Sequence, residues 1–182
     1  MMGSAFIPRP LADAWRGTGL TGRLAVGLLF ILAFTLLWER AGDVFGSAMP
    51  WPLTGLVAAA GWARLGLSIR PMATLVLLGF AFDAVTLAPF GVFPIVFLTT
   101  YAMLAFSGVV IGGEMDPLTG TLLPHIGIAA GVIVLWVFAS MLAVGPAEVL
   151  PLLLVWILCS LLYLLFEGLF DLESAKTAAT GS

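Results

Sequence analysis

Residues 72–112 read MATLVLLGFAFDAVTLAPFGVFPIVFLTTYAMLAFSGVVIG, and this stretch decides the fold. It holds two apolar runs, at residues 72–88 and 92–112, which are separated only by a Pro89-Phe90-Gly91 break. Each run has about the 20 residues that an α-helix needs to cross a bilayer. Because the break is so short, the two helices are predicted to be antiparallel neighbours.

The composition of the whole chain agrees with this interpretation. Of its 182 residues, 62% are hydrophobic and only 9% are charged, whereas soluble domains usually carry about 25% charged residues. The apolar runs are continuous, unlike the short alternating segments of a transmembrane β-barrel. The sequence therefore predicts an all-α protein, a polytopic membrane helical bundle with almost no extramembrane domain.

Four further apolar runs have a workable length for a membrane crossing. The prediction is thus about six spans, at approximately residues 24–38, 49–67, 72–88, 92–112, 124–144 and 148–170. They form a transmembrane domain over residues 24–170, between cytoplasmic tails at 1–23 and 171–182. In the second span, Trp51 and Trp62 are expected near the two membrane interfaces, where amphipathic rings accumulate.

Basic residues near the spans set the predicted orientation. With six spans, most of them share the side of both termini, while Arg40 lies opposite: Arg9, Arg16, Arg23, Arg64, Arg70 and Lys176. Both termini are therefore placed in the cytoplasm. The basic residues bear on orientation and not on nucleic acid, which is not expected as a partner.

Asp83 is the first residue to question, because it lies inside an apolar run. A charge at such a place costs roughly 2.5 to 3.5 kcal/mol on insertion scales. The functional interpretations are a proton or cation site, or a polar latch between helices. A latch is favoured, with the carboxyl group kept neutral by burial and hydrogen-bonded to Thr99, Thr100 or Tyr101, because few other buried ionisable groups accompany it.

Two other polar residues lie near predicted span ends. Glu167 is one helical turn before Asp171, so the two share a face. They are interpreted as an acidic interfacial end that water solvates, with docking of a basic partner segment as the sharper alternative. His125, after Pro124, is interpreted as a solvated interfacial side chain.

Small residues recur at helical spacing in the fourth and fifth spans. Gly108 and Gly112 form one small-xxx-small pattern, and Gly127 and Gly131 form another. Such patterns let helix backbones approach closely. Packing within the chain is favoured over an oligomer interface, because matches are expected by chance among 21 glycines.

No arrangement of residues predicts catalysis or a bound cofactor. The chain has one histidine and one cysteine, so no Cys/His cluster for a metal is expected. Cys159 lies in an apolar run and is interpreted as a small buried hydrophobe. No Ser/His/Asp set, glycine-rich phosphate loop or pair of carboxylates is found. The prediction is therefore a protein without enzyme activity, cofactor or metal, whose surroundings are membrane lipid.

The central stretch resembles a known family. Gly79-xxx-Asp83, then Pro89-x-Gly91 and Tyr101 on the next helix, is similar to the core pattern of the rod shape-determining protein MreD family, with Phe90 in place of the usual leucine. Upstream, Pro50-x-Pro52-Leu53 and Trp62-Ala63 also look like the second span of that family. The resemblance covers roughly residues 50–112.

This resemblance implies a small membrane fold of five to six spans in the bacterial inner membrane. It also implies a scaffold role in the elongasome, which maintains rod cell shape by organising lateral peptidoglycan synthesis. The implied partners are MreC, the MreB filament, the SEDS glycosyltransferase and the class B penicillin-binding transpeptidase. The chain departs from the family at Glu114 and Asp116, where members often carry basic residues, and its tail is acidic.

Two other function classes stay open. The substrate-binding S component of energy-coupling-factor vitamin transporters is also a six-helix membrane protein of this size. On that hypothesis Trp136 and Trp156, which lie mid-span, would form a pocket with the outward loops. The chain offers few polar side chains to bind a vitamin, so this ranks second. A membrane enzyme ranks third, because candidate catalytic groups are missing.

Overall fold

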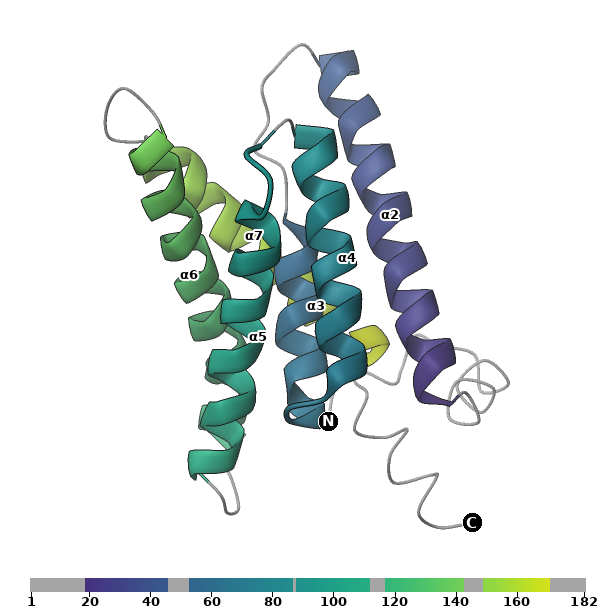
Figure 1. Ribbon diagram of the computed structural model, residues 1–182, viewed down its shortest axis with the longest axis vertical. Coiled ribbons are helices and arrows are strands. Elements are labelled where there is room, and N and C mark those ends of the chain that lie inside the picture. The colour runs from purple at the N-terminus through teal and green to yellow at the C-terminus, as the bar shows by residue number, and fades with distance from the viewer. Residues whose placement is uncertain (1–18, 46–52, 87, 112–116, 143–148, 171–182) are drawn as a thin grey trace.

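The computed structural model describes residues 19–45, 53–86, 88–111, 117–142 and 149–170. Within these ranges the regular structure is entirely helical, as Figure 1 shows. The α-helices are α2 (Leu20–Phe45), α3 (Thr54–Trp62), α4 (Ile69–Thr86), α5 (Val92–Ile111), α6 (Pro117–Leu142) and α7 (Val149–Phe170), and a short 3₁₀ helix, η1 (Ala63–Leu65), follows α3. The predicted all-α class is confirmed.

Three of these helices are long and apolar enough to cross a membrane. The qualifying segments are Ile69–Thr86, Gly120–Met141 and Val149–Phe170. Shorter apolar segments lie in α2, at Leu20–Thr35, and in α5, at Val92–Ser107. The chain is therefore a helical protein of membrane character, while the count of six crossings and the N-in/C-in orientation stay predictions.

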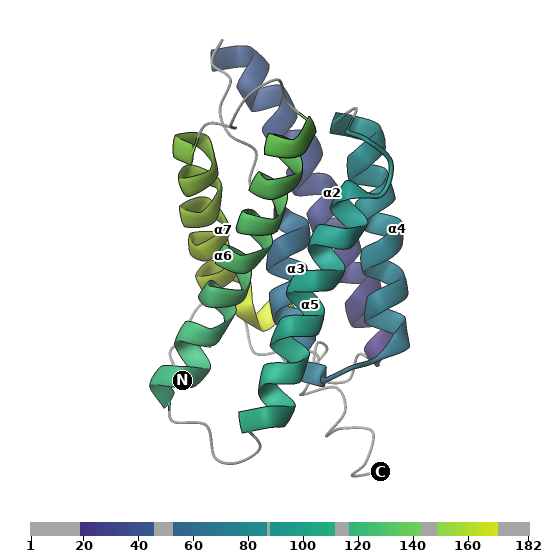
Figure 2. The same cartoon turned by 60° about the vertical axis from the view of Figure 1, so that its left-hand side comes forward.

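Helix α3 occupies the centre of the bundle, with the other helices around it (Figures 1 and 2). All nine of its residues are buried. Its sequence, TGLVAAAGW, is rich in small residues, which allows neighbours to approach closely. The ring of Phe97 lies against Gly55, and Phe170 lies against Gly61. Burial on all sides follows from small size and apolar composition together.

The second span differs from its prediction. A run at residues 49–67 was expected, but the α-helix covers only Thr54–Trp62 before η1 begins. The Trp62 side chain is 0% exposed, so it packs between helices, and its expected position near a membrane interface stays a prediction. It packs against Phe170, with ring centroids 6.3 Å apart, and Gly27 leaves room beside it. Trp51 lies outside the described residues.

The fifth span also begins earlier than predicted. A loop was expected to continue to residue 123, but α6 starts at Pro117. Proline suits this first position, because the first turn needs no N–H partner there. Pro124 lies inside the helix and is buried. Interior proline is tolerated in such helices where neighbouring groups compensate the freed carbonyl.

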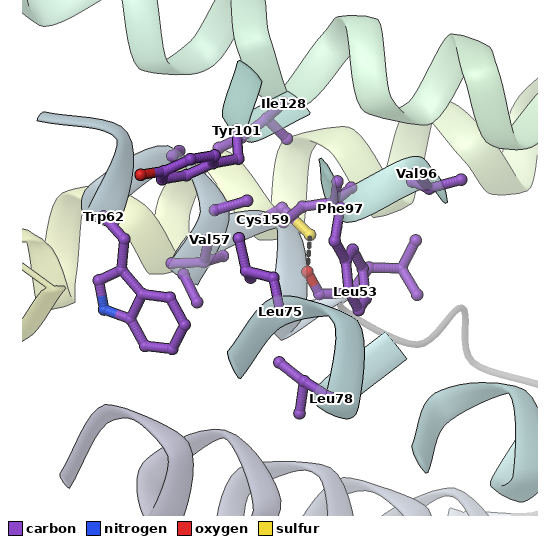
Figure 3. Close-up of a cluster of buried hydrophobic side chains, with 14 of the residues drawn as sticks. Leu53, Val57, Trp62, Leu75, Leu78, Val96, Phe97, Tyr101, Ile128 and Cys159 are labelled. Atoms are coloured by element: carbon purple, nitrogen blue, oxygen red, sulfur yellow. Dashed lines mark hydrogen bonds between the residues drawn. The ribbon is translucent and has the colours of Figure 1, made fainter. Parts of the chain in front are cut away.

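The core gathers side chains from all the described α-helices, α2 included, and Figure 3 shows the part to which α3, α4, α5, α6 and α7 contribute. Cys159 is buried there, as predicted, and its thiol donates a hydrogen bond to the carbonyl of Leu53 at 3.5 Å. Successive helices run up and down, so α2 begins and α7 ends in the same half of the bundle (Figures 1 and 2). The α4–α5 turn lies in the opposite half. As a result, the turn between α4 and α5 and the link before α4 lie at opposite ends of the bundle.

Candidate functional site

The predicted hairpin of α4 and α5 is confirmed, and Asp83 lies at its turn. The Asp83 side chain is 2% exposed. One carboxyl oxygen accepts a hydrogen bond from the backbone N–H of Gly91 at 2.6 Å, and the other accepts from the N–H of Phe93 at 3.0 Å. The side chain accepts in both bonds, so neither bond requires a proton on it.

The partners predicted for Asp83 are wrong. The Thr100 hydroxyl donates to the carbonyl of Val96 in its own helix, and the Tyr101 hydroxyl donates to the carbonyl of Gly66. Thr99, Thr100 and Tyr101 lie two helical turns into α5, about 11 Å or more along the axis from its first residue. Asp83 instead faces the start of α5, where free N–H groups and the positive end of the helix dipole favour a carboxylate.

Every N–H group at the start of α5 is accounted for. Gly91 and Phe93 donate to Asp83, Val92 donates to the carbonyl of Pro89 at 3.3 Å, and Ile95 donates to that of Gly91 at 3.2 Å. Pro94 has no N–H group. Because unpaired backbone groups are costly in apolar surroundings, Asp83 and Pro94 together allow α5 to begin against its neighbour without a polar loop.

Gly79 allows the two helices to meet at this point. It lies one turn before Asp83, on the same face of α4. A Cβ atom at Gly79 would lie 2.6 Å from Cα of Pro94 and 2.7 Å from its Cδ, so any side chain would push α5 away. The spacing Gly79-xxx-Asp83 thus places a close backbone approach next to a polar contact.

The turn itself uses Pro89, Phe90 and Gly91. Gly91 has φ of 98°, a conformation that glycine adopts without strain. The Phe90 ring stacks on that of Phe80, with centroids 4.5 Å apart and planes 10° from parallel. Phe90 is nonetheless 83% exposed, so an aromatic pair caps the outside of the turn.

Tyr101 joins α5 to the other end of α4. Its side chain is fully buried, and its hydroxyl donates to the carbonyl of Gly66 at 2.6 Å and accepts from the N–H of Ser68 at 3.0 Å. Both partners lie in the link just before α4. Asp83 and Tyr101 therefore fasten the two ends of α4 to α5, and we call this pair of contacts the hairpin clamp.

The remaining predicted glycines lie away from the hairpin clamp. Gly108 is within α5, while Gly112 lies outside the described residues, so their packing role stays a prediction. The pattern of Gly127 and Gly131 packs within the chain, as favoured. A Cβ atom at Gly127 would meet Leu104, and one at Gly131 would meet Thr100, so α6 lies close against α5.

Glu167 belongs to a second group of contacts. It forms an ion pair with Arg64 of η1, and the Arg64 guanidinium lies 5.9 Å from the ring centroid of Tyr163. His125 packs edge-on against the same ring, with centroids 5.8 Å apart, and is half-buried. Glu167 is thus paired with a basic residue of the same chain. His125 packs between helices, and not only against solvent as it was interpreted from the sequence.

Trp136 and Trp156 line an apolar groove of about 410 Å³ between α6 and α7. The N–H of Trp156 donates to the carbonyl of His125 at 3.1 Å. The groove therefore ends beside the group of contacts around His125. Within the described ranges, no cluster of His, Cys, Asp or Glu is placed to hold a metal ion.

Comparison with known proteins returned no matching family model, no matching curated protein and no matching solved structure.

The sequence pointed to the hairpin clamp but not to the contacts of Arg64. Arg64 and Glu167 are 103 residues apart, so no local pattern joins them. One signal was present in α7, where Trp156, Ser160, Tyr163 and Glu167 recur at spacings of four and three. Residues at these spacings share one face of a helix. Side chains with polar groups on one face of an apolar helix indicate that this face contacts polar groups of another element.

Proposed function

We propose that this chain is a multi-pass scaffold of the bacterial inner membrane that takes part in the elongasome. In this role it maintains rod shape by organising lateral peptidoglycan synthesis. It works through contacts with an MreC-like protein and other elongasome membrane proteins, among them the SEDS glycosyltransferase and the class B penicillin-binding transpeptidase. It carries out no chemical step itself.

One observation carries this proposal. The five residues behind the resemblance to the MreD family, Gly79, Asp83, Pro89, Gly91 and Tyr101, all lie on the α4–α5 hairpin. Four of them have a defined structural role there. Gly79 allows the helices to approach closely, and Asp83 caps the start of α5. Gly91 reverses the chain at positive φ, and Tyr101 binds the link between Gly66 and Ser68. A pattern that builds a rigid helical hairpin suits a protein whose role is to hold partners.

The predicted multi-pass topology is compatible with the same role. With both termini in the cytoplasm, the Arg64–Glu167 ion pair lies on the cytoplasmic side and the Pro89–Gly91 turn faces outward. Positive charge on the cytoplasmic side is the usual arrangement. Exposed apolar side chains then face lipid or the spans of partners, as for Leu77 of α4 and Leu165 of α7.

Depletion in the native bacterium tests this proposal. Cells that carry no second copy are depleted of the protein, then examined for outline and for labelled new wall. We expect swelling or rounding and loss of wall insertion along the side. A tagged copy should also retain the MreC-like protein in mild detergent, while a tagged multi-pass protein of similar size should not. Normal rods without detectable protein would overturn the proposal.

A second candidate function is a vitamin-binding subunit similar to an energy-coupling-factor S component. The groove lined by Trp136 and Trp156 favours it, since aromatic side chains often line small-molecule pockets. Its lining has few polar groups to orient a vitamin, so this candidate ranks second. Retention of a small molecule through purification, together with association with an ATPase module, would establish it over the scaffold role.

A further inference from the structure

The α6–α7 groove lies in one half of the seam between these helices. Helix α6 contributes Ala129, Val132, Ile133 and Trp136, and α7 contributes a matching set that runs from Val149 to Trp156. Seven residues of helix span about 10 Å. The groove is therefore a short furrow with Val149, the first residue of α7, at one end and Trp156 at the other.

The lining is almost purely hydrocarbon. Apart from two tryptophan rings, its residues are alanine, valine, isoleucine and leucine. The Trp156 N–H is already occupied by the carbonyl of His125. A hydrophilic ligand would leave its polar groups without partners here, which is costly, so the occupant must be apolar.

The seam is closed beyond Trp156. There the Trp156–His125 hydrogen bond joins α7 to α6, and the His125 ring packs on Tyr163. A partner helix that followed the α6–α7 seam past Trp156 would meet this closure. Stable protein interfaces also use roughly 20 to 30 residues a side, whereas only eight residues line the groove. The occupant is thus a narrow apolar chain and not a helix.

We propose that the groove holds one hydrocarbon chain of a membrane lipid from the leaflet that borders Val149, with the chain end near Trp156. The 10 Å length falls within the roughly 15 Å depth of one leaflet. An empty furrow would forgo dispersion contacts on both walls, and a single chain restores them. The inference rests on α6 and α7 lying in a membrane and is independent of the scaffold role.

Photo-cross-linking tests this proposal with the full-length protein in vesicles. The probe is phosphatidylethanolamine with a diazirine at the end of one acyl chain, present in trace amount among unlabelled phosphatidylethanolamine and phosphatidylglycerol. The controls are Leu161 and Leu164, which are about as exposed as Val149 and Leu153 in the groove. We expect cross-links at residues 129–136 and 149–156 to exceed those at the two controls on the order of fivefold, since the groove contacts a chain on both walls.

Matched variants separate groove binding from ordinary contact with lipid. Ala129→Trp places a ring in the groove and should remove the excess cross-linking, while Leu161→Trp adds the same ring outside it and should leave the excess intact. Val149→Trp, at the exposed mouth, serves if Ala129→Trp does not fold. Even labelling of all exposed apolar faces would overturn the proposal. So would groove residues that are labelled in vesicles but protected by a protein in native membranes.

Discussion

The backbone N–H of Gly91 donates a hydrogen bond of 2.6 Å to the side chain of Asp83, which lies eight residues earlier on the neighbouring helix. With the second bond from Phe93, this contact replaces a missing helical turn at the start of α5. The presence of an acidic residue in an apolar run is thus explained by backbone donors at the start of a helix, which have no partner within that helix. The two hydrogen bonds hold the start of α5 against the last turn of α4.

Asp83→Leu should insert into the membrane but lower the amount of folded protein. It leaves the buried N–H group of Phe93 and the partly buried N–H group of Gly91 without acceptors, and leaving a buried group unpaired costs about 1 to 3 kcal/mol. The measurement is thermal unfolding in detergent, alongside the yield of monodisperse protein. Asp83→Asn keeps one good acceptor and should fall between wild type and Asp83→Leu. Wild-type yield and unfolding temperature for Asp83→Leu would show that the contact does not stabilise the hairpin.

Gly79→Ala should destabilise the hairpin although alanine favours helices. The new Cβ atom would meet the backbone of Pro94, and overpacking of this kind costs about 1 to 3 kcal/mol. Gly168→Ala in α7 is the matched control, because nothing lies within 4 Å of its Cβ position. That change should be neutral or stabilise by up to about 1 kcal/mol. Equal effects of the two changes on unfolding temperature would contradict the close approach.

Tyr101→Phe should loosen the link before α4 while keeping the ring in place. It leaves the Gly66 carbonyl and the Ser68 N–H unpaired, at a cost of about 1 to 2 kcal/mol. Hydrogen exchange at Ser68 should therefore quicken. Ser107→Ala, also in α5, removes an exposed hydroxyl that bonds only within its own helix, and it should change stability by less than about 0.5 kcal/mol. Unchanged protection of Ser68 would argue against the clamp.

Much of the central hairpin could be predicted from the sequence because its signals are local. Runs at 72–88 and 92–112 predicted helices that the structure places at Ile69–Thr86 and Val92–Ile111. Length, hydropathy and a Pro-x-Gly break are enough for such boundaries. The partner of Asp83 was missed, since backbone N–H groups carry no mark in the sequence. The local sequence pattern thus predicted the hairpin, whereas the hydrogen bonds of Asp83 depend on the exact residue at which α5 begins.

The rest depended on long-range packing. An apolar run at residues 49–67 does not reveal that α3 spans only Thr54–Trp62 or that Trp62 is buried. Small residues in α3 permit that position, but which helices surround it is decided by the whole bundle. The approach of Arg64 to Glu167 has the same origin. Such contacts become visible only when helices far apart in sequence are placed side by side.

A double-mutant cycle on Arg64 and Glu167 should give a small, salt-dependent coupling. Their side chains are 31% and 42% exposed, and exposed pairs contribute about 0.2 to 1 kcal/mol. Arg64→Gln should cost more than Glu167→Gln, because Arg64 also lies over the Tyr163 ring, and the cycle isolates the pair from that extra contact. Coupling should shrink as salt rises. The control cycle pairs Arg70→Gln with Glu167→Gln and should show no coupling. If both cycles gave the same value at every salt concentration, the ion pair would not be what joins η1 to α7.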